Sequence, residues 1–254
     1  MHRVAKWLGG LSGQGSWLAG CRESGVRPVT AGPGRVEAVV FDLDGTLADT
    51  MALAPQAYAD AIRRLGGPEV SRGEVLAAWN IGPTPTVLEH FLGRKVTARD
   101  VECFYDSFGA VTAAVRPFPG IPAMLRSLRR QGYRMAIFTH ATRRAATLTI
   151  AAAGLSHFRL PLVGGEEAAG PKPAPDGLLL ACRRIGTATS AAAYVGDAEA
   201  DLQCAVAAGS LAVHARWGAA AAAVTAPHLA ARHPGDVVDL LALHRAALLR
   251  TEHG

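Results

Sequence analysis

The sequence predicts an α/β fold: a Rossmann-like parallel sheet flanked by helices, with an inserted α-helical cap domain. The first observation is that, in the C-terminal half, short apolar runs alternate with helical patterns that each stop at a glycine. The second is that residues 51–116 carry helical periodicity without a strand pattern and interrupt this alternation. Parallel strands need crossover connections, so the alternation favours a parallel sheet and the interruption favours a helical insertion after the first strand.

The expected strands are short and bounded by turn residues. The first, at residues 36–41, is an apolar run that stops at Asp42. Four more strands are expected at 133–138, 160–163, 192–195 and 211–214, and helices at 121–128, 142–153, 175–185 and 199–208, ended by Gly132, Gly154, Gly186 and Gly209. An alanine-rich helix at 218–224 and a packing helix after residue 235 complete the pattern. Ligands of parallel sheets bind at the carboxyl ends of the strands, so we expect the functional site there.

The chain is expected to divide into three parts. Residues 1–35 are glycine-rich, lack clear periodicity and are interpreted as a flexible N-terminal extension. Residues 36–50 and 117–250 are expected to form the α/β core, and residues 51–116 the helical cap. The two crossings between core and cap would serve as hinges.

Composition narrows the class of protein. Half of the residues are hydrophobic and 19% are charged, which is typical of a globular protein. No run of about 18 apolar residues is present, so no membrane partner is expected. The segment that ends at Cys21 resembles a bacterial lipoprotein processing site, but polar residues interrupt its apolar part, so a tail is favoured. The four cysteines form no CxxC pair, which argues against a zinc site or a disulfide framework and favours a cytoplasmic protein.

The net charge of +5 and the pI of about 9.3 would suit an anionic partner. The arginines are scattered in pairs, and no aromatic residues interleave with a basic stripe, so no nucleic acid partner is expected. Arg63, Arg64 and Arg94 in the predicted cap would suit an anionic substrate, but a solvated surface role is favoured for each.

The strongest chemical signal is the hexapeptide from Asp42 to Leu47, directly after the first strand. The carboxylates of Asp42 and Asp44, two residues apart on an extended backbone, point the same way. One can attack a phosphorus atom, and the other can protonate the leaving oxygen and later activate water. Gly45 permits a sharp turn here. An acidic turn without chemistry is the alternative, and the complete hexapeptide after a buried strand favours the chemical interpretation.

Three more polar segments lie at strand ends or before helices. Thr139 and His140 close the second strand, where a hydroxyl and backbone N–H groups can hold phosphoryl oxygens; an ordinary turn is the alternative. Lys172 lies among prolines that keep the backbone extended, and a fixed ammonium there would offset charge on the aspartate and the phosphoryl group. Asp197 directly follows a predicted strand, where it could be a metal ligand or a helix cap. Asp201 would support the site from the next helix.

Together these motifs resemble the haloacid dehalogenase superfamily, and within it the phosphoglycolate phosphatase-like group with a small helical cap. The resemblance covers residues 36–215. It implies that Asp42 is the nucleophile and Asp44 the general acid and base, with Thr139 and Lys172 as further catalytic residues.

The resemblance also implies a Mg²⁺ cofactor, held by the Asp42 carboxylate, the Asp44 backbone carbonyl and Asp197. The supporting residues are expected to be Gly45, Thr46, His140, Gly196 and Asp201. His140 stands where family members often carry asparagine, which leaves both its role and the substrate open.

The expected function is Mg²⁺-dependent hydrolysis of a small phosphomonoester through a phosphoryl-aspartate on Asp42, with a phosphoglycolate-like substrate as the family default. Asp44 favours phosphoryl transfer over carbon–halogen cleavage, and residues 51–62 lack the lysine that phosphonate-cleaving relatives need. Ala54 stands where sugar-phosphate mutases carry a hinge histidine, so hydrolysis is favoured over mutase action. A non-catalytic regulatory or binding protein is the alternative from another class.

The expected partner is a small phosphorylated metabolite, bound by a monomer or a homodimer. A small cap suits small phosphoesters because it can close over the site and exclude bulk water. The loop at residues 81–85 is expected to turn toward the active site.

Overall fold

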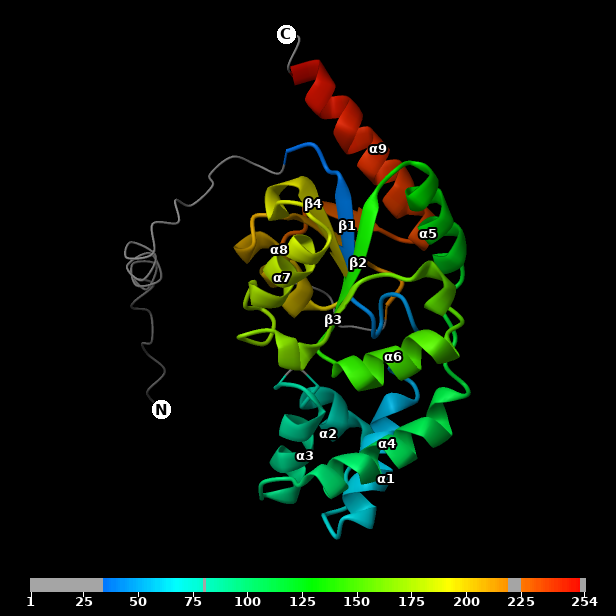
Figure 1. Cartoon of the computed structure of the whole chain (residues 1–254), viewed down its shortest axis with the longest axis vertical. Coiled ribbons are helices and arrows are strands. Elements are labelled where there is room, and N and C mark those ends of the chain that lie inside the picture. The colour runs from blue at the N-terminus through cyan, green and yellow to red at the C-terminus, as the bar shows by residue number, and fades with distance from the viewer. Residues whose placement is uncertain (1–33, 80, 219–224, 252–254) are drawn as a thin grey trace, which may run out of the picture. The chain divides into compact units, whose positions relative to one another are not determined.

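The computed structural model describes residues 34–79, 81–218 and 225–251 (Figure 1). Within these residues, parallel strands form one sheet in the order β3-β2-β1-β4-β5-β6. The strands are β1 (Ala38–Phe41), β2 (Arg134–Phe138), β3 (Leu162–Val163), β4 (Ala192–Gly196), β5 (Leu211–Ala215) and β6 (Leu229–Ala231). The predicted parallel α/β architecture is therefore confirmed.

The register of the central strands determines where the polar segments meet. Phe41, the last residue of β1, pairs with Ile137 on β2 and with Val195 on β4. The three strands therefore end at one edge of the sheet, and the residues that follow each of them lie close together in space.

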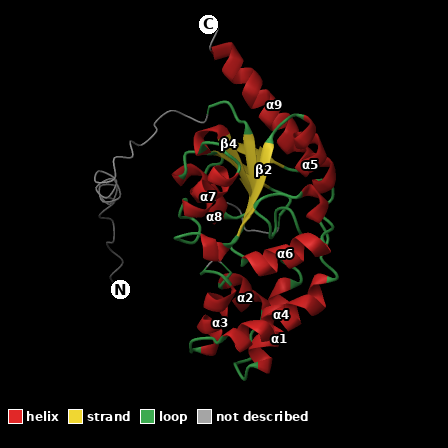
Figure 2. Cartoon of the chain, viewed as in Figure 1, coloured by secondary structure: helices red, strands yellow, loops and turns green. Residues whose placement is uncertain are grey.

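Helices cover both faces of the sheet, as Figure 2 shows. On one face, α5 (Ile121–Arg130), α6 (Arg143–Ala152) and α9 (Pro234–Thr251) pack against alternate strand residues such as Val39 and Phe41. On the other face, α7 (Asp176–Arg184) and α8 (Glu199–Ala207) pack against Ala38 and Val40. All four residues of β1 are buried, as expected for a central strand covered on both sides.

The glycines that were expected to end helices do so. Gly132, Gly154, Gly186 and Gly209 have φ of 82°, 69°, 64° and 68°, in the left-handed region that favours glycine. Short 3₁₀ turns lie at η2 (Ser156–Phe158), η3 (Gly165–Glu167) and η4 (Thr189–Ala191).

A helical insertion separates β1 from β2, as predicted. It contains α1 (Ala54–Arg64), α2 (Arg72–Ala77), α3 (Thr84–Leu92) and α4 (Ala98–Thr112), which lie together at one end of the sheet in Figure 1. Tyr58, Ile62, Leu88, Phe104 and Phe108 are buried in a separate apolar cluster, which also includes Ala145 of α6. Capping boxes begin α2 and α4, because a serine or threonine and an acidic residue three positions later exchange hydrogen bonds with the backbone.

The chain enters and leaves the insertion side by side. The Asp49 backbone N–H donates to the Arg116 carbonyl at 3.0 Å, and Ala48 forms an antiparallel bridge with Pro117. These contacts lie next to the segments near Thr50 and Pro117 that were expected to act as hinges, and the hinge role stays a prediction.

Some expectations differ from the structure or fall outside its described part. The three-residue strand β6 was not predicted, because its Leu-Ala-Ala sequence is too short and too rich in alanine to show a strand pattern. The expected extension at 1–35 lies almost wholly outside the described residues, as does the expected helix at 218–224. Among the described residues, no helix is long and apolar enough to cross a membrane.

Candidate active site

Asp42 and Lys172 form a buried ion pair at the carboxyl end of β1. The Lys172 Nζ donates to Asp42 Oδ1 at 2.6 Å and to Asp201 Oδ1 at 2.8 Å. Asp201 is fixed in turn, because it accepts from the Tyr194 hydroxyl at 3.2 Å and from the Ala198 backbone N–H at 3.0 Å. The two carboxylates thus hold the ammonium directly beside the predicted nucleophile.

Asp197 follows β4 and packs closely against the turn after Asp42. Thr46 donates its hydroxyl to Asp197 Oδ1 at 3.0 Å. Gly45 has a φ of 87°, and a Cβ at this position would lie 2.6 Å from Asp197 Oδ2. A side chain there would displace the Asp197 carboxylate, so this glycine is needed for close approach as well as for the turn.

Asp44 is held by two hydroxyl groups. Thr50 donates to Asp44 Oδ1 at 2.8 Å, and Thr139 donates to Asp44 Oδ2 at 3.2 Å. The Thr139 oxygen also accepts from the Ala141 backbone N–H at 3.1 Å, which fixes the hydroxyl at the end of β2.

The electrostatics of the site oppose its full ionisation. Burial, reinforced by Asp201, Asp197 and Asp44, raises the pKa of Asp42 well above its usual range, although Lys172 acts against this. Burial also raises the pKa of Asp44, against the two hydroxyl hydrogen bonds. Burial alone would lower the pKa of Lys172, but the carboxylates of Asp201 and Asp42 outweigh it and raise that pKa, so this side chain stays cationic.

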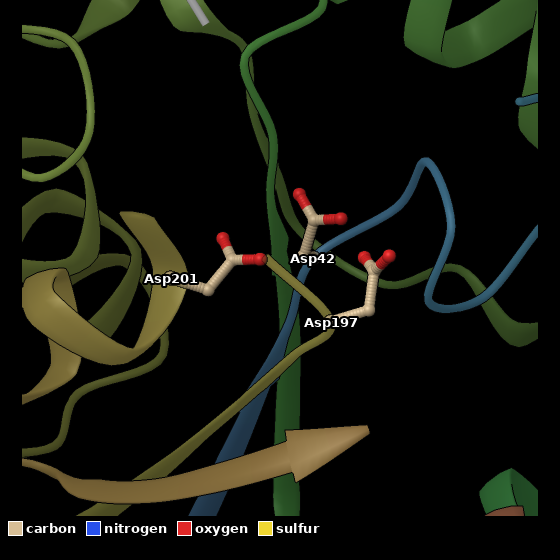
Figure 3. Close-up of side chains that lie close together, drawn as sticks. All are labelled: Asp42, Asp197 and Asp201. Atoms are coloured by element: carbon tan, nitrogen blue, oxygen red, sulfur yellow. The ribbon is translucent and has the colours of Figure 1, made fainter. Parts of the chain in front are cut away.

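The donor set fits a divalent cation. One carboxylate oxygen from each of Asp42, Asp197 and Asp201 lies within 4.8 Å of the others, and the three side chains lie close together in Figure 3. With Asp44, four carboxylates face one ammonium among the described residues that line the site. Such an excess of buried negative charge is stabilised by a hard cation with oxygen ligands.

A cavity of about 30 Å³ opens onto these groups. Its lining residues are Asp42, Asp44, Trp79, Thr139, His140, Lys172, Ala198, Ala200 and Asp201. Most of the lining comes from the core, and Trp79, from the segment after α2, comes from the insertion. Trp79 is positioned by an edge-to-face contact with Tyr58, with ring centroids 5.9 Å apart.

The structure gathers the predicted site residues and adds three that the sequence argument did not assign to the site: Thr50, Tyr194 and Trp79. Tyr194 carries the clearest signal, because a hydroxyl in an otherwise apolar buried strand needs a partner. The three arginines that would suit an anionic substrate contact residues of the insertion rather than the site: Arg63 pairs with Asp60, Arg64 with Ser107, and Arg94 with Asp100.

Comparison with known proteins identifies the family. The model of the haloacid dehalogenase-like hydrolases matches residues 39–215. The chain belongs to this family. The predicted family and enzyme class, a hydrolase, are therefore confirmed.

Individual relatives support the same assignment. A probable phosphatase, IndB of Dickeya dadantii, is 35% identical over 79% of this chain and 88% of its own length. A plasmid-encoded phosphoglycolate phosphatase of Cupriavidus necator is 34% identical over 71% of this chain and 81% of its own. The structure of CbbY from Rhodobacter sphaeroides, in complex with phosphate, has a TM-score of 0.70 at 21% identity. The match covers 80% of this chain and 96% of the CbbY chain, and it shows that the two proteins share a fold.

Proposed function

We propose that this chain is a Mg²⁺-dependent phosphatase that hydrolyses a small phosphomonoester through a phosphoryl-aspartate on Asp42. The observation that carries the proposal is the buried contact of 2.6 Å between Asp42 Oδ1 and Lys172 Nζ, with Asp44 two residues away and held by two hydroxyls. An ammonium in this place offsets the charge of both the aspartate and an approaching phosphoryl group.

In the first step, a carboxylate oxygen of Asp42 attacks phosphorus as the bond from phosphorus to the leaving oxygen breaks. Asp44 donates its proton to that oxygen, and the raised pKa of this carboxyl suits an acid that must arrive protonated. Thr139 then turns its hydroxyl from Asp44 to a phosphoryl oxygen, while Lys172 contacts another.

In the second step, water attacks phosphorus and the bond to Asp42 breaks, which releases inorganic phosphate. Asp44, left ionised by the first step, takes the proton of the attacking water. Asp42, Asp197 and the Asp44 backbone carbonyl would hold Mg²⁺, which supplies positive charge to the phosphoryl oxygens. Asp201 acts through Lys172 and positions it.

The insertion is proposed to act as a cap, with the core formed by residues 36–50 and 117–250. The paired crossings at Ala48 and Pro117 allow it to move as a unit, and Trp79 closes one wall of the cavity. The cavity of about 30 Å³ holds only a water or two, so substrate entry is proposed to require movement of the insertion, and relatives named phosphoglycolate phosphatase make phosphoglycolate the first candidate. A mutase would need a side chain that exchanges protons at position 54. Ala54 has only a methyl group, which cannot exchange protons, so hydrolysis is favoured over mutase action.

Phosphate release from a panel of short phosphomonoesters, with Mg²⁺ or with EDTA, tests the proposal. The wild-type protein is expected to release phosphate in Mg²⁺ and not in EDTA. The Asp42→Asn variant is expected to release none in either solution. Asp239→Asn is the matched control, because it makes the same change at an exposed position on α9. Absence of release from every compound by folded, Mg²⁺-loaded protein would refute the proposal.

A further inference from the structure

A second cavity, of about 350 Å³, lies between α5, α6 and the segment from Leu155 to Leu162. None of the residues that line it also lines the active-site cavity. Its volume is in the range of sites that bind small organic molecules, whereas the active-site cavity measures about 30 Å³. The two cavities are therefore separate, and the chemistry at Asp42 does not account for this one.

The deep walls of this cavity are apolar. They are formed by buried side chains from the sheet, from α5 and from the turn after β1: Leu47, Leu125, Ile137, Leu155 and Leu162. A cavity of about 150 Å³ with walls of this kind holds benzene. The cavity of about 350 Å³ therefore accommodates an apolar body of roughly eight to ten carbon atoms.

The polar lining of the cavity is cationic and includes no carboxylate side chain. It consists of Arg143, Thr147, Ser156 and Arg159. The Arg143 guanidinium is already engaged, because it donates to Glu167 Oε1 at 2.6 Å and to the Leu162 carbonyl at 2.5 Å. The Arg159 guanidinium has no hydrogen-bond or ion-pair partner among the described residues. One unpaired positive charge therefore stands beside an apolar cavity, which matches a ligand with one negative charge.

The backbone of Arg159 is an independent indication. Arg159 has a φ of 49°, and among the described residues it is the one residue other than glycine with a positive φ. It ends the 3₁₀ turn η2, where its N–H donates to the Ser156 carbonyl at 3.0 Å. Glycine would adopt this conformation without the steric cost that a side chain adds. A strained residue whose side chain lines a cavity is a candidate for a binding role.

We propose that this cavity binds an amphipathic monocarboxylate, with the carboxylate paired to Arg159 and the apolar body packed against Leu47 and Ile137. A guanidinium can donate to both oxygens of one carboxylate, and burial of the apolar body supplies the rest of the affinity. This proposal does not rest on the proposed function, because it uses no residue of the active site.

Octanoate is the probe, and titration calorimetry on the full chain is the measurement. Mg²⁺ and inorganic phosphate are present throughout to occupy the active site. One octanoate is expected to bind per chain, with an affinity about 10- to 100-fold higher than that of 1-octanol, which has the apolar body without the charge. No binding of octanoate at millimolar concentration, equal affinities for octanoate and octanol, or competition between octanoate and phosphate would overturn the proposal.

Arg159→Gln tests the charged contact and is expected to lower the affinity for octanoate by about 10- to 100-fold while leaving that for octanol unchanged. Arg99→Gln is the matched control, because it removes the same charge at an exposed position on α4, and it should bind octanoate as wild type does. Arg159→Gly relieves the backbone strain, so its loss of octanoate binding would not be a loss of folding, and thermal unfolding checks this. Octanoate binding that is unchanged in both variants at position 159 would overturn the assignment.

Discussion

Removing one carboxylate from the site should stabilise the metal-free protein. In Asp197→Asn, the repulsion between residue 197 and Asp42, whose oxygens lie within 4.8 Å of one another, is lost. Two unit charges at that separation repel by about 3 kcal/mol at an effective dielectric constant of about 20. Part of this repulsion is already offset by the Lys172 ammonium, which lies 2.6 Å from Asp42 Oδ1, so the expected gain is about 1–3 kcal/mol. The Thr46 hydrogen bond survives, since the amide oxygen can accept it.

Thermal unfolding in EDTA and in excess Mg²⁺ measures this effect. For a chain of this size, the gain corresponds to a rise in Tm of about 3–8 °C in EDTA. Mg²⁺ at about 100 times its Kd should stabilise the wild-type protein by about 2.7 kcal/mol and have much less effect on the variant. Asp239→Asn is the control and should behave as wild type in both solutions. A variant that is less stable than wild type in EDTA, yet equally stabilised by Mg²⁺, would refute the placement of the metal beside Asp197.

Three further changes test the neighbouring residues. Asp44→Asn removes the proton donor and should lower kcat by about 10²- to 10⁴-fold for an alkyl phosphate. The loss of kcat should be smaller for nitrophenyl phosphate, because its leaving group needs no proton. Equal losses with the two substrates would exclude the role of Asp44 as an acid. Gly45→Ala should weaken Mg²⁺ binding, measured by calorimetry, whereas Gly132→Ala introduces similar backbone strain at a φ of 82° with no atom within 4 Å of the new Cβ. Equal Mg²⁺ affinities in these two variants would contradict the contact with the metal site. Tyr194→Phe should lower the free energy of unfolding, measured with denaturant, by about 1 kcal/mol, because the hydroxyl contacts to Asp201 and the Phe138 carbonyl are lost. An unchanged free energy of unfolding would show that these hydrogen bonds do not stabilise the fold.

Much of the fold could be predicted because its signals are local. The apolar runs of the three central strands β2, β1 and β4 are short and are followed directly by a polar residue, and each expected terminal glycine adopts the left-handed conformation that ends a helix. Strand β6 carries neither signal, since three residues of leucine and alanine suit a helix equally well, and only pairing with β5 makes them a strand.

The candidate site could be predicted in part for a related reason. Asp42, Thr139 and Asp197 follow strands that are neighbours in the sheet, so the topology alone brings them to one edge. Thr50 and Trp79 come from segments whose path depends on how the insertion folds back over that edge. No local pattern in the sequence encodes that path, and their contacts emerge only from the tertiary structure.

The central claim is that phosphorus is transferred to Asp42, and trapping the covalent intermediate tests it most directly. With nitrophenyl phosphate, whose leaving group needs no proton, Asp44→Asn leaves the first step open and slows the second, because the ionised Asp44 carboxylate that would accept the proton of water is gone. Rapid acid quench with substrate labelled in the phosphoryl group, followed by peptide mapping, should place an alkali-labile label on Asp42 and none on Asp42→Asn. Label on another residue, such as His140, or turnover without any labelled protein, would contradict the account.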